Sequence, residues 1–138
     1  MRLVLGGLVV AALVGCGGHA KKGTTTTRAK PPPSGIRVSL TADSHRPKVG
    51  KPWHYEVRVT DASGHPVPAT VHLQILFGGT PVGQVGRHHV ANGVWSETIG
   101  TDGNAPFPAR SLGVPLVFEA VVTARGQTRR VRYPIRVR

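Results

Sequence analysis

The sequence predicts an all-β fold, an antiparallel sandwich of about seven short strands. From residue 36 onward, apolar and polar residues alternate with a period of two in several segments, as is typical of strands that bury one face. Sequences rich in Gly, Pro and Asn separate these segments and predict turns. No segment repeats apolar residues at helical spacing, so the sequence does not favour a helical fold.

Each alternating segment places its apolar residues on one parity. These sets are Ile36, Val38 and Leu40; Trp53, Tyr55, Val57 and Val59; Val71, Leu73, Ile75 and Phe77; Leu116, Phe118, Ala120 and Val122; and Val131, Tyr133, Ile135 and Val137. A slip of one residue would expose a whole set, so each strand has a defined inner face. We expect the sets beginning at Trp53, Val71 and Val131 to share one hydrophobic interior.

The connecting segments carry turn signals. They are Arg46-Pro47, Ala62-Ser63-Gly64, Gly78-Gly79, Ala91-Asn92-Gly93 and Arg125-Gly126-Gln127. Asn92-Gly93 predicts a tight hairpin, because the central residues of such a turn need positive φ. Pro134 cannot donate a ladder hydrogen bond, so we expect the last strand to lie at a sheet edge. The long stretch 100–113 leaves two alternatives for Phe107: an exposed recognition tip, or a side chain tucked over the end of the core.

Residues 46–79 resemble bacterial immunoglobulin-like domains. The resemblance lies in a strand ending Val-Thr-Asp at 59–61, the turn Gly-His-Pro-Val at 64–67, and the following strand, whose apolar residues face the first. It implies an immunoglobulin-like sandwich over residues 36–138. The antibody-type Cys…Trp…Cys arrangement is absent from the sequence, so the resemblance implies no disulfide. A transthyretin-like sandwich would show similar turns.

The N-terminus has the order of a bacterial export signal. Arg2 is followed by an apolar or glycine run, Leu3 to Val14, of about 12 residues, which is shorter than the roughly 20 that a membrane-spanning helix needs. Leu13-Val14-Gly15-Cys16 resembles the lipobox of bacterial lipoproteins. The resemblance implies cleavage after residue 15 and diacylglyceryl transfer to the Cys16 thiol, which would anchor the chain at the extracytoplasmic side of a membrane. Since Cys16 is the only cysteine, stability must come from packing rather than from disulfides.

Residues 16–35 read as a flexible tether rich in Thr and Pro. The whole chain has a net charge of +12. Five of its 18 Lys and Arg residues precede Ile36, which leaves 13 against all six Asp and Glu, or +7, in the predicted domain. Such a balance favours an anionic neighbour: lipid headgroups, an acidic envelope polymer or an acidic protein. Nucleic acid would also fit the positive charge, but an exported protein rarely meets nucleic acid.

The last predicted strand carries a candidate binding surface. Arg130, Arg132, Arg136 and Arg138 share its outward face. They fit either a docking stripe for an anionic partner or a solvated face that discourages edge-to-edge pairing. For a solvated side chain, Arg132→Ala would change stability by no more than about 0.5 kcal/mol.

The sequence shows no catalytic constellation. Nucleophilic catalysis needs a Ser, Cys or Thr beside His and a carboxylate, and no Gly-x-Ser-x-Gly motif occurs. Asp61 and Asp102 fall in turn sequences, and Glu56 and Glu119 fall on outward strand faces. We therefore expect no enzyme activity and no cofactor.

Six histidines fall in the predicted domain: His45, His54, His65, His72, His88 and His89. The region around them also resembles copper-handling periplasmic sandwiches, which share the Val-Gly-Lys-Pro opening at 49–52 and the Gly-x-Pro-Val turn. Copper(I) favours thiolate or thioether ligands, whereas the only Met is Met1 and the only Cys is the predicted lipid site. His88 and His89 are adjacent and would point to opposite faces. We therefore expect no metal site, and a metal-handling lipoprotein remains the alternative to a non-enzymatic binding or assembly module.

Overall fold

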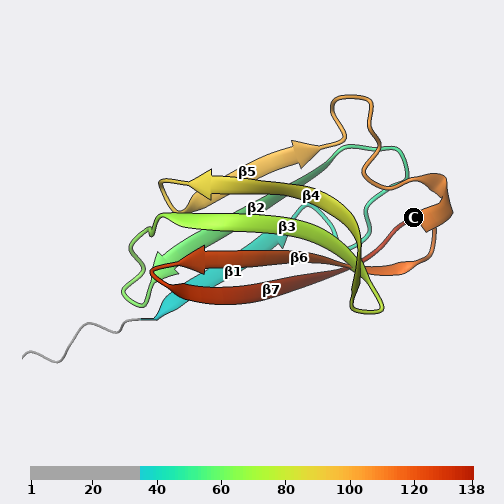
Figure 1. Cartoon of the computed structure of the whole chain (residues 1–138). Coiled ribbons are helices and arrows are strands. Elements are labelled where there is room, and N and C mark those ends of the chain that lie inside the picture. The colour runs from blue at the N-terminus through green and yellow to red at the C-terminus, as the bar shows by residue number, and fades with distance from the viewer. Residues whose placement is uncertain (1–34) are drawn as a thin grey trace, which may run out of the picture. The chain divides into compact units, whose positions relative to one another are not determined.

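The computed structural model describes residues 35–138. The predicted signal peptide, Cys16 and the tether up to residue 34 lie outside the described residues. The described segment contains seven strands, labelled in Figure 1, and one short 3-10 helix. They are β1 (Ile36–Ala42), β2 (Trp53–Asp61), β3 (Ala69–Phe77), β4 (Thr80–Val90), β5 (Val94–Ile99), η1 (Ala109–Ser111), β6 (Pro115–Ala124) and β7 (Gln127–Arg136).

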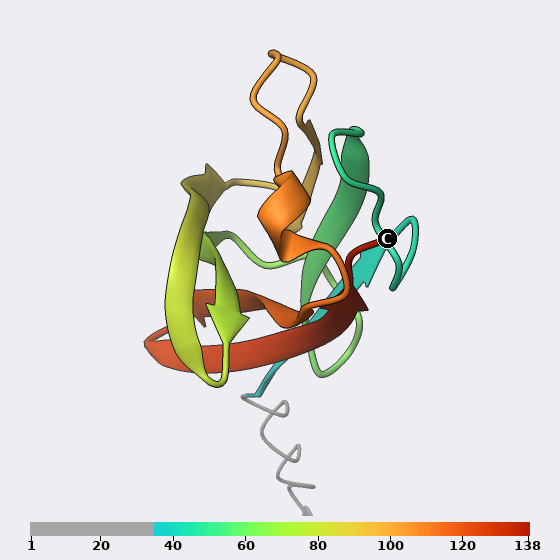
Figure 2. The same cartoon turned by 90° about the vertical axis from the view of Figure 1, so that its right-hand side faces the viewer.

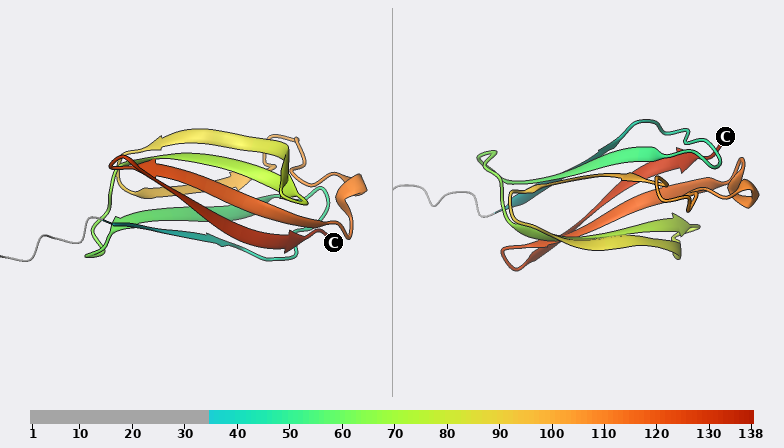
Figure 3. Two further views of the ribbon diagram at one scale, coloured as in Figure 1. Left: turned by 60° about the horizontal axis from the view of Figure 1, so that its bottom comes forward. Right: turned by 90° about the horizontal axis from the view of Figure 1, so that it is seen from above.

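The strands form two antiparallel sheets, ordered β1-β2-β5 and β4-β3-β6-β7. The sheets pack face to face, as the end-on view of Figure 2 and the side views of Figure 3 show. This arrangement confirms the predicted immunoglobulin-like β-sandwich. The constant-type immunoglobulin domain has its fourth strand in the sheet of its first two. Here β4 instead pairs with β3.

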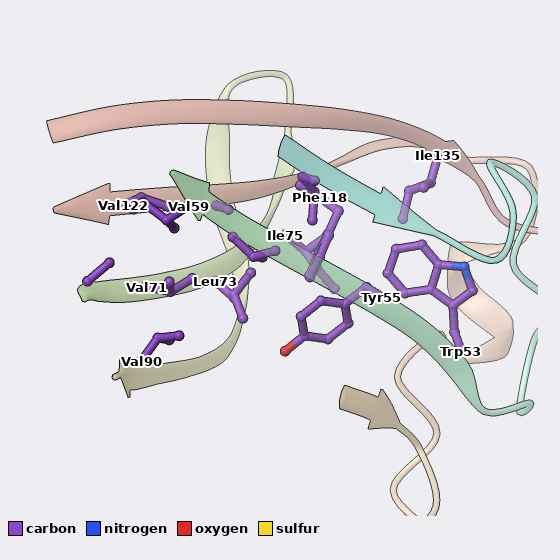
Figure 4. Close-up of a cluster of buried hydrophobic side chains, with 14 of the residues drawn as sticks. Trp53, Tyr55, Val59, Val71, Leu73, Ile75, Val90, Phe118, Val122 and Ile135 are labelled. Atoms are coloured by element: carbon purple, nitrogen blue, oxygen red, sulfur yellow. The ribbon is translucent and has the colours of Figure 1, made fainter. Parts of the chain in front are cut away.

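The interior holds the residues that the alternation predicts (Figure 4). Trp53, Tyr55, Val57 and Val59 are at most 2% exposed. Val71, Leu73 and Ile135 are buried against them, while Val131 and Tyr133 are partly buried at the margin. Trp53 is central, because its ring lies edge-on to Phe118, with centroids 5.1 Å apart, and to Phe107, with centroids 5.6 Å apart. The second alternative for Phe107 is therefore the correct one: its side chain is 1% exposed and closes the end of the core.

The predicted burial of Phe77 is wrong, since this side chain is 52% exposed. The register of β3 against β4 shifts between Ile75 and Leu76, and the pairing of β3 with β6 ends at Leu76. Phe77 therefore lies beyond the last β3–β6 pair and is paired only with Thr80 of β4. Leu76, expected on the outward face, is only 3% exposed.

The predicted hairpin at Asn92-Gly93 is also wrong, because β4 and β5 belong to different sheets. The turn carries the chain across the sandwich. Gly93 has a φ of 67°, and its carbonyl accepts a hydrogen bond from Val59 N at 2.6 Å. A Cβ at this position would lie 2.5 Å from Val59 O, so the turn requires glycine for its close approach to β2.

Pro134 lies on β7, an edge strand, as predicted. Beyond Pro134 this edge is covered by the segment after β1. His45 O accepts from Arg136 N at 2.8 Å, Pro47 O accepts from Arg138 N at 2.9 Å, and Val49 N donates to Arg138 O at 2.9 Å. These bonds close the sandwich on the β1–β7 side.

Candidate functional site

The predicted arginine stripe divides into two halves, and both arginines of the first half are paired with Glu119. Arg132 Nε lies 2.7 Å from Glu119 Oε2, and Arg130 Nη1 lies 3.2 Å from Oε1. Gln74 of β3 donates a third hydrogen bond to Oε1 at 2.8 Å. Glu119 lies on the outward face, as expected, but it is only 1% exposed because these longer side chains surround it. Arg132 is therefore exposed on the outward face, as expected, and it is also paired with a buried carboxylate.

The three donors also fix the ionisation of Glu119. Burial raises the pKa of its carboxyl, but the hydrogen bonds from Arg132 and Gln74 and the charges of both arginines outweigh burial, and the pKa lies below its ordinary value. Glu119 is consequently a carboxylate at neutral pH. Arg130 and Arg132 hold this internal anion, so they are poorly placed to bind an external one.

The second half of the stripe, Arg136 and Arg138, is extended by the segment that covers β7. The backbone bonds from His45, Pro47 and Val49 follow a parallel ladder, in which Arg46 lies beside Arg136 and Lys48 beside Arg138. The ladder lacks one bond because Pro47 has no N–H. Pro47 is buried and Val49 packs against the core, whereas Arg46 and Lys48 are exposed. The loop thus adds two cations beside the two arginines.

We call Arg46, Lys48, Arg136 and Arg138 the cationic corner. It lies where the chain ends beside the loop that follows β1 (Figure 2). Among the described residues, no Asp or Glu side chain lies within ion-pair distance of any of these four. Arg58, Arg125, Arg130 and Arg132, in contrast, each have a carboxylate partner. Like charges on neighbouring strands are unfavourable for the fold, so the corner is suited to an external anion.

A groove of about 500 Å³ adjoins the cationic corner. Arg46, Arg136 and His45 lie in its lining, together with the apolar residues Pro115, Val117 and Pro134. His45 is held in place: its Nδ1 lies 2.7 Å from Pro134 O, and its ring stacks on Tyr133 with centroids 3.9 Å apart. The groove therefore offers cations beside an apolar floor.

Arg46 and Lys48 are the functional candidates that sequence analysis missed. Their signal is present, since Arg46-Pro47-Lys48-Val49 alternates charged and apolar residues. Only the fold shows that this segment runs beside β7, because the pairing joins residues about 90 positions apart in the chain.

A second polar cluster joins the sheets on the β4–β5 side. Tyr55 OH donates to Glu97, and the indole N–H of Trp95 lies 3.4 Å from Glu97 Oε2. His88 stacks on Trp95, with its Nε2 3.7 Å from the same oxygen. Burial, and then the hydrogen bond to Glu97, raise the pKa of Tyr55. The sequence gives only the inward parity of Tyr55 as a signal for this cluster, whereas the pairing of Tyr55 with Glu97 comes from the fold.

His88 and Glu97 give two potential metal ligands, fewer than the three or four protein ligands of zinc sites. Within residues 35–138, no group of three or more His, Cys, Asp or Glu is arranged to hold a metal ion. His89 faces away from His88, as predicted, and is exposed.

The turn aspartates act on their own backbone, as the sequence predicts. Asp61 Oδ1 accepts from Ser63 N at 2.9 Å and from His65 N at 3.0 Å. Asp102 Oδ1 accepts from Asn104 N at 3.2 Å. Both carboxylates therefore serve local turn structure.

Comparison of the chain with models of known protein families gives no match, and neither does comparison with curated proteins. In the segment that the structure describes, no helix is both long and apolar enough to span a membrane.

Proposed function

We propose that this chain is a surface lipoprotein, anchored through a lipid on Cys16, whose immunoglobulin-like domain is a non-enzymatic binding module for an anionic envelope partner. The cationic corner carries the proposal. It gathers four exposed cations without a nearby carboxylate side chain. Backbone hydrogen bonds between the segment after β1 and the end of β7 fix the positions of these four residues. The lipid anchor rests on the lipobox-like sequence at 13–16.

Binding to the envelope tests the module. The full chain, kept in a neutral detergent, is sedimented with cell-envelope fragments from which membranes have been extracted. Three preparations are compared: untreated fragments, fragments stripped of acidic polymers, and fragments treated with protease. We expect sedimentation with untreated fragments that weakens as salt rises, since exposed charges are screened within about 10 Å at 0.1 M salt. Loss on removal of the polymers identifies an acidic polymer, and loss on proteolysis identifies an acidic protein. No sedimentation, or sedimentation indifferent to salt, contradicts the proposal.

The anchor is tested separately by Cys16→Ser. We expect the variant to leave the membrane fraction or to retain its signal peptide, because the thiol is the lipid acceptor. A variant that is still cleaved and still held by membranes contradicts the lipobox interpretation.

Calorimetric titration with copper and zinc addresses the metal-handling alternative. We expect no stoichiometric site of micromolar or better affinity, which corresponds to about −8 kcal/mol. A site of that affinity would favour the alternative over the binding module.

A further inference from the structure

We propose that the groove beside the cationic corner is a binding site for an organic phosphate, a phosphomonoester whose carbon skeleton lies on the floor formed by Pro115, Val117 and Pro134. This inference rests on the proposed function and deepens it, because it names the chemistry of the anion. Arg46 and Arg136 would bind the phosphate group. Lys48 and Arg138 would add to the positive field.

Arg46 and Arg136 are paired across two neighbouring backbone segments. The bond from Arg136 N to His45 O sets these residues side by side on adjacent backbone segments, and both side chains are exposed beside one groove. Neighbouring backbone segments in a sheet lie about 4.8 Å apart. Two guanidinium groups whose backbone segments are this close together can both reach one ligand group.

The number of oxygens and charges favours a phosphate group over a carboxylate as the ligand of two arginines. A guanidinium binds two oxygens of an anion in a fork. A carboxylate has two oxygens and one charge, so it matches one arginine. A phosphomonoester has three free oxygens and a charge of about −1.5 to −2 at pH 7, so it matches two.

The apolar floor favours a phosphate ester over inorganic phosphate. Pro115, Val117 and Pro134 line the groove directly beside the cations. Inorganic phosphate would leave this surface wet, whereas the carbon skeleton of an ester would cover it. Burial of apolar surface is favourable, and this favours an organic phosphate over the free ion.

Three small probes separate these contributions: phenyl phosphate, inorganic phosphate and benzoate. Each is titrated into the full chain in neutral detergent and followed by NMR at the methyl groups of Val117. We expect phenyl phosphate to bind at least about fivefold more tightly than either other probe, because only it combines the phosphate with an apolar ring. The indole N–H of Trp95, which belongs to the β4–β5 cluster, should not shift. Equal affinity for phenyl phosphate and benzoate overturns the proposal, as does the absence of shifts at Val117.

Paired variants locate the site. Arg46→Gln with Arg136→Gln should weaken phenyl phosphate binding at least about tenfold, because both guanidinium groups and their bidentate hydrogen bonds are lost. The control, Arg37→Gln with Arg87→Gln, removes two other exposed arginines that have no ion pair in the described segment, and it should change affinity by less than about twofold. Arg46→Lys with Arg136→Lys keeps both positive charges but lacks the bidentate geometry of the guanidinium. It should weaken phenyl phosphate binding by an amount between those of the parent and the glutamine pair.

The outcomes distinguish this inference from the proposed function. Equal losses in both glutamine pairs mean that general positive charge binds the anion. That result overturns the phosphate site while envelope sedimentation still stands. Binding of phenyl phosphate at Val117 without any envelope sedimentation supports the site and contradicts the proposed function.

Titration with detergent micelles that contain a lipid identifies the source of the phosphate. Phosphatidic acid carries a phosphomonoester and phosphatidylcholine does not, so shifts at Val117 with the first alone identify a lipid headgroup. If the soluble ester binds and neither lipid does, the ligand is a soluble or polymer-borne phosphate. If neither the lipid nor the soluble ester shifts Val117, the proposal is wrong.

Discussion

At the scale of single residues, Glu119 shows what strand alternation predicts and what it does not. Its parity places it on the outward face, and the structure agrees. Parity does not indicate which neighbours cover that face. Two long arginine side chains from the edge strand and Gln74 from the other neighbour converge on the carboxylate, so an outward residue becomes one of the most buried.

The first prediction concerns Arg132→Ala. Loss of the 2.7 Å bond leaves the buried Glu119 carboxylate with Arg130 and Gln74 only. We expect a loss of about 1–3 kcal/mol in the free energy of unfolding, in place of the 0.5 kcal/mol limit for a solvated arginine. Arg136→Ala is the control, because Arg136 lies on the same face without a carboxylate partner, and it should cost no more than about 0.5 kcal/mol. Denaturant unfolding measures both, and equal effects would contradict the assigned role of Glu119.

The second prediction is a dependence on pH. The pKa of Glu119 is lowered by folding from an ordinary value of 4.5, so its carboxylate stabilises the fold fully above about pH 4.5. That contribution is lost as pH falls through the lower pKa of the folded state. We expect Glu119→Gln to unfold more easily than the parent at pH 7, with a smaller difference near pH 3. Melting temperatures at both pH values test this, and a difference that grows on acidification would contradict it.

At the scale of the elements, local sequence predicts the position of most strands. The departures from prediction depend on which strands lie next to one another. Alternation and turn residues predict where β1, β2, β3, β6 and β7 lie. They do not reveal that β4 and β5 belong to different sheets, because the same Asn-Gly turn suits a hairpin and a crossing between layers. Likewise, the exposure of Phe77 depends on where β6 stops pairing with β3, which no local pattern encodes.

The third prediction compares two glycines with positive φ. Gly93 and Gly126 have φ values of 67° and 70°, so alanine costs about 1–2 kcal/mol of backbone strain at either position. A Cβ at Gly126 meets open space, whereas one at Gly93 lies 2.5 Å from Val59 O and 2.9 Å from Val67 N. We expect Gly93→Ala to cost at least about 3 kcal/mol and Gly126→Ala about 1 kcal/mol. Thermal melting measures the difference, and equal melting temperatures would contradict the close packing of the crossing turn.

At the scale of the whole molecule, stability depends on one hydrophobic core, because the described segment contains no cysteine. The core was predictable, since each inner face follows the alternation. The cationic corner was half predictable: Arg136 and Arg138 lie on the predicted stripe, but Arg46 and Lys48 join them only through long-range backbone pairing. The resulting domain is closed on the β1–β7 side, and four of its exposed cations lie together there.

The fourth prediction concerns Trp53, which packs against aromatic rings from β6, from β7 and from the loop holding Phe107. Trp53→Ala should cost roughly 3–5 kcal/mol. A domain typically has about 5–15 kcal/mol of stability, so we expect a large drop in melting temperature or loss of folding. Calorimetry on the parent and variant measures this, and similar melting curves would contradict the central place of Trp53.

The most direct test of the central claim is photo-crosslinking in living cells, with a photoreactive residue at Pro115, exposed on the floor of the groove, or at Thr41, exposed on β1 of the opposite sheet. We expect the chain labelled at Pro115 to become covalently joined to one anionic envelope component and the chain labelled at Thr41 not to. We also expect Arg46→Gln with Arg136→Gln to abolish the Pro115 product. Equal crosslinking from both positions, or a Pro115 product that survives loss of both arginines, would contradict the claim that the cationic corner is the binding surface.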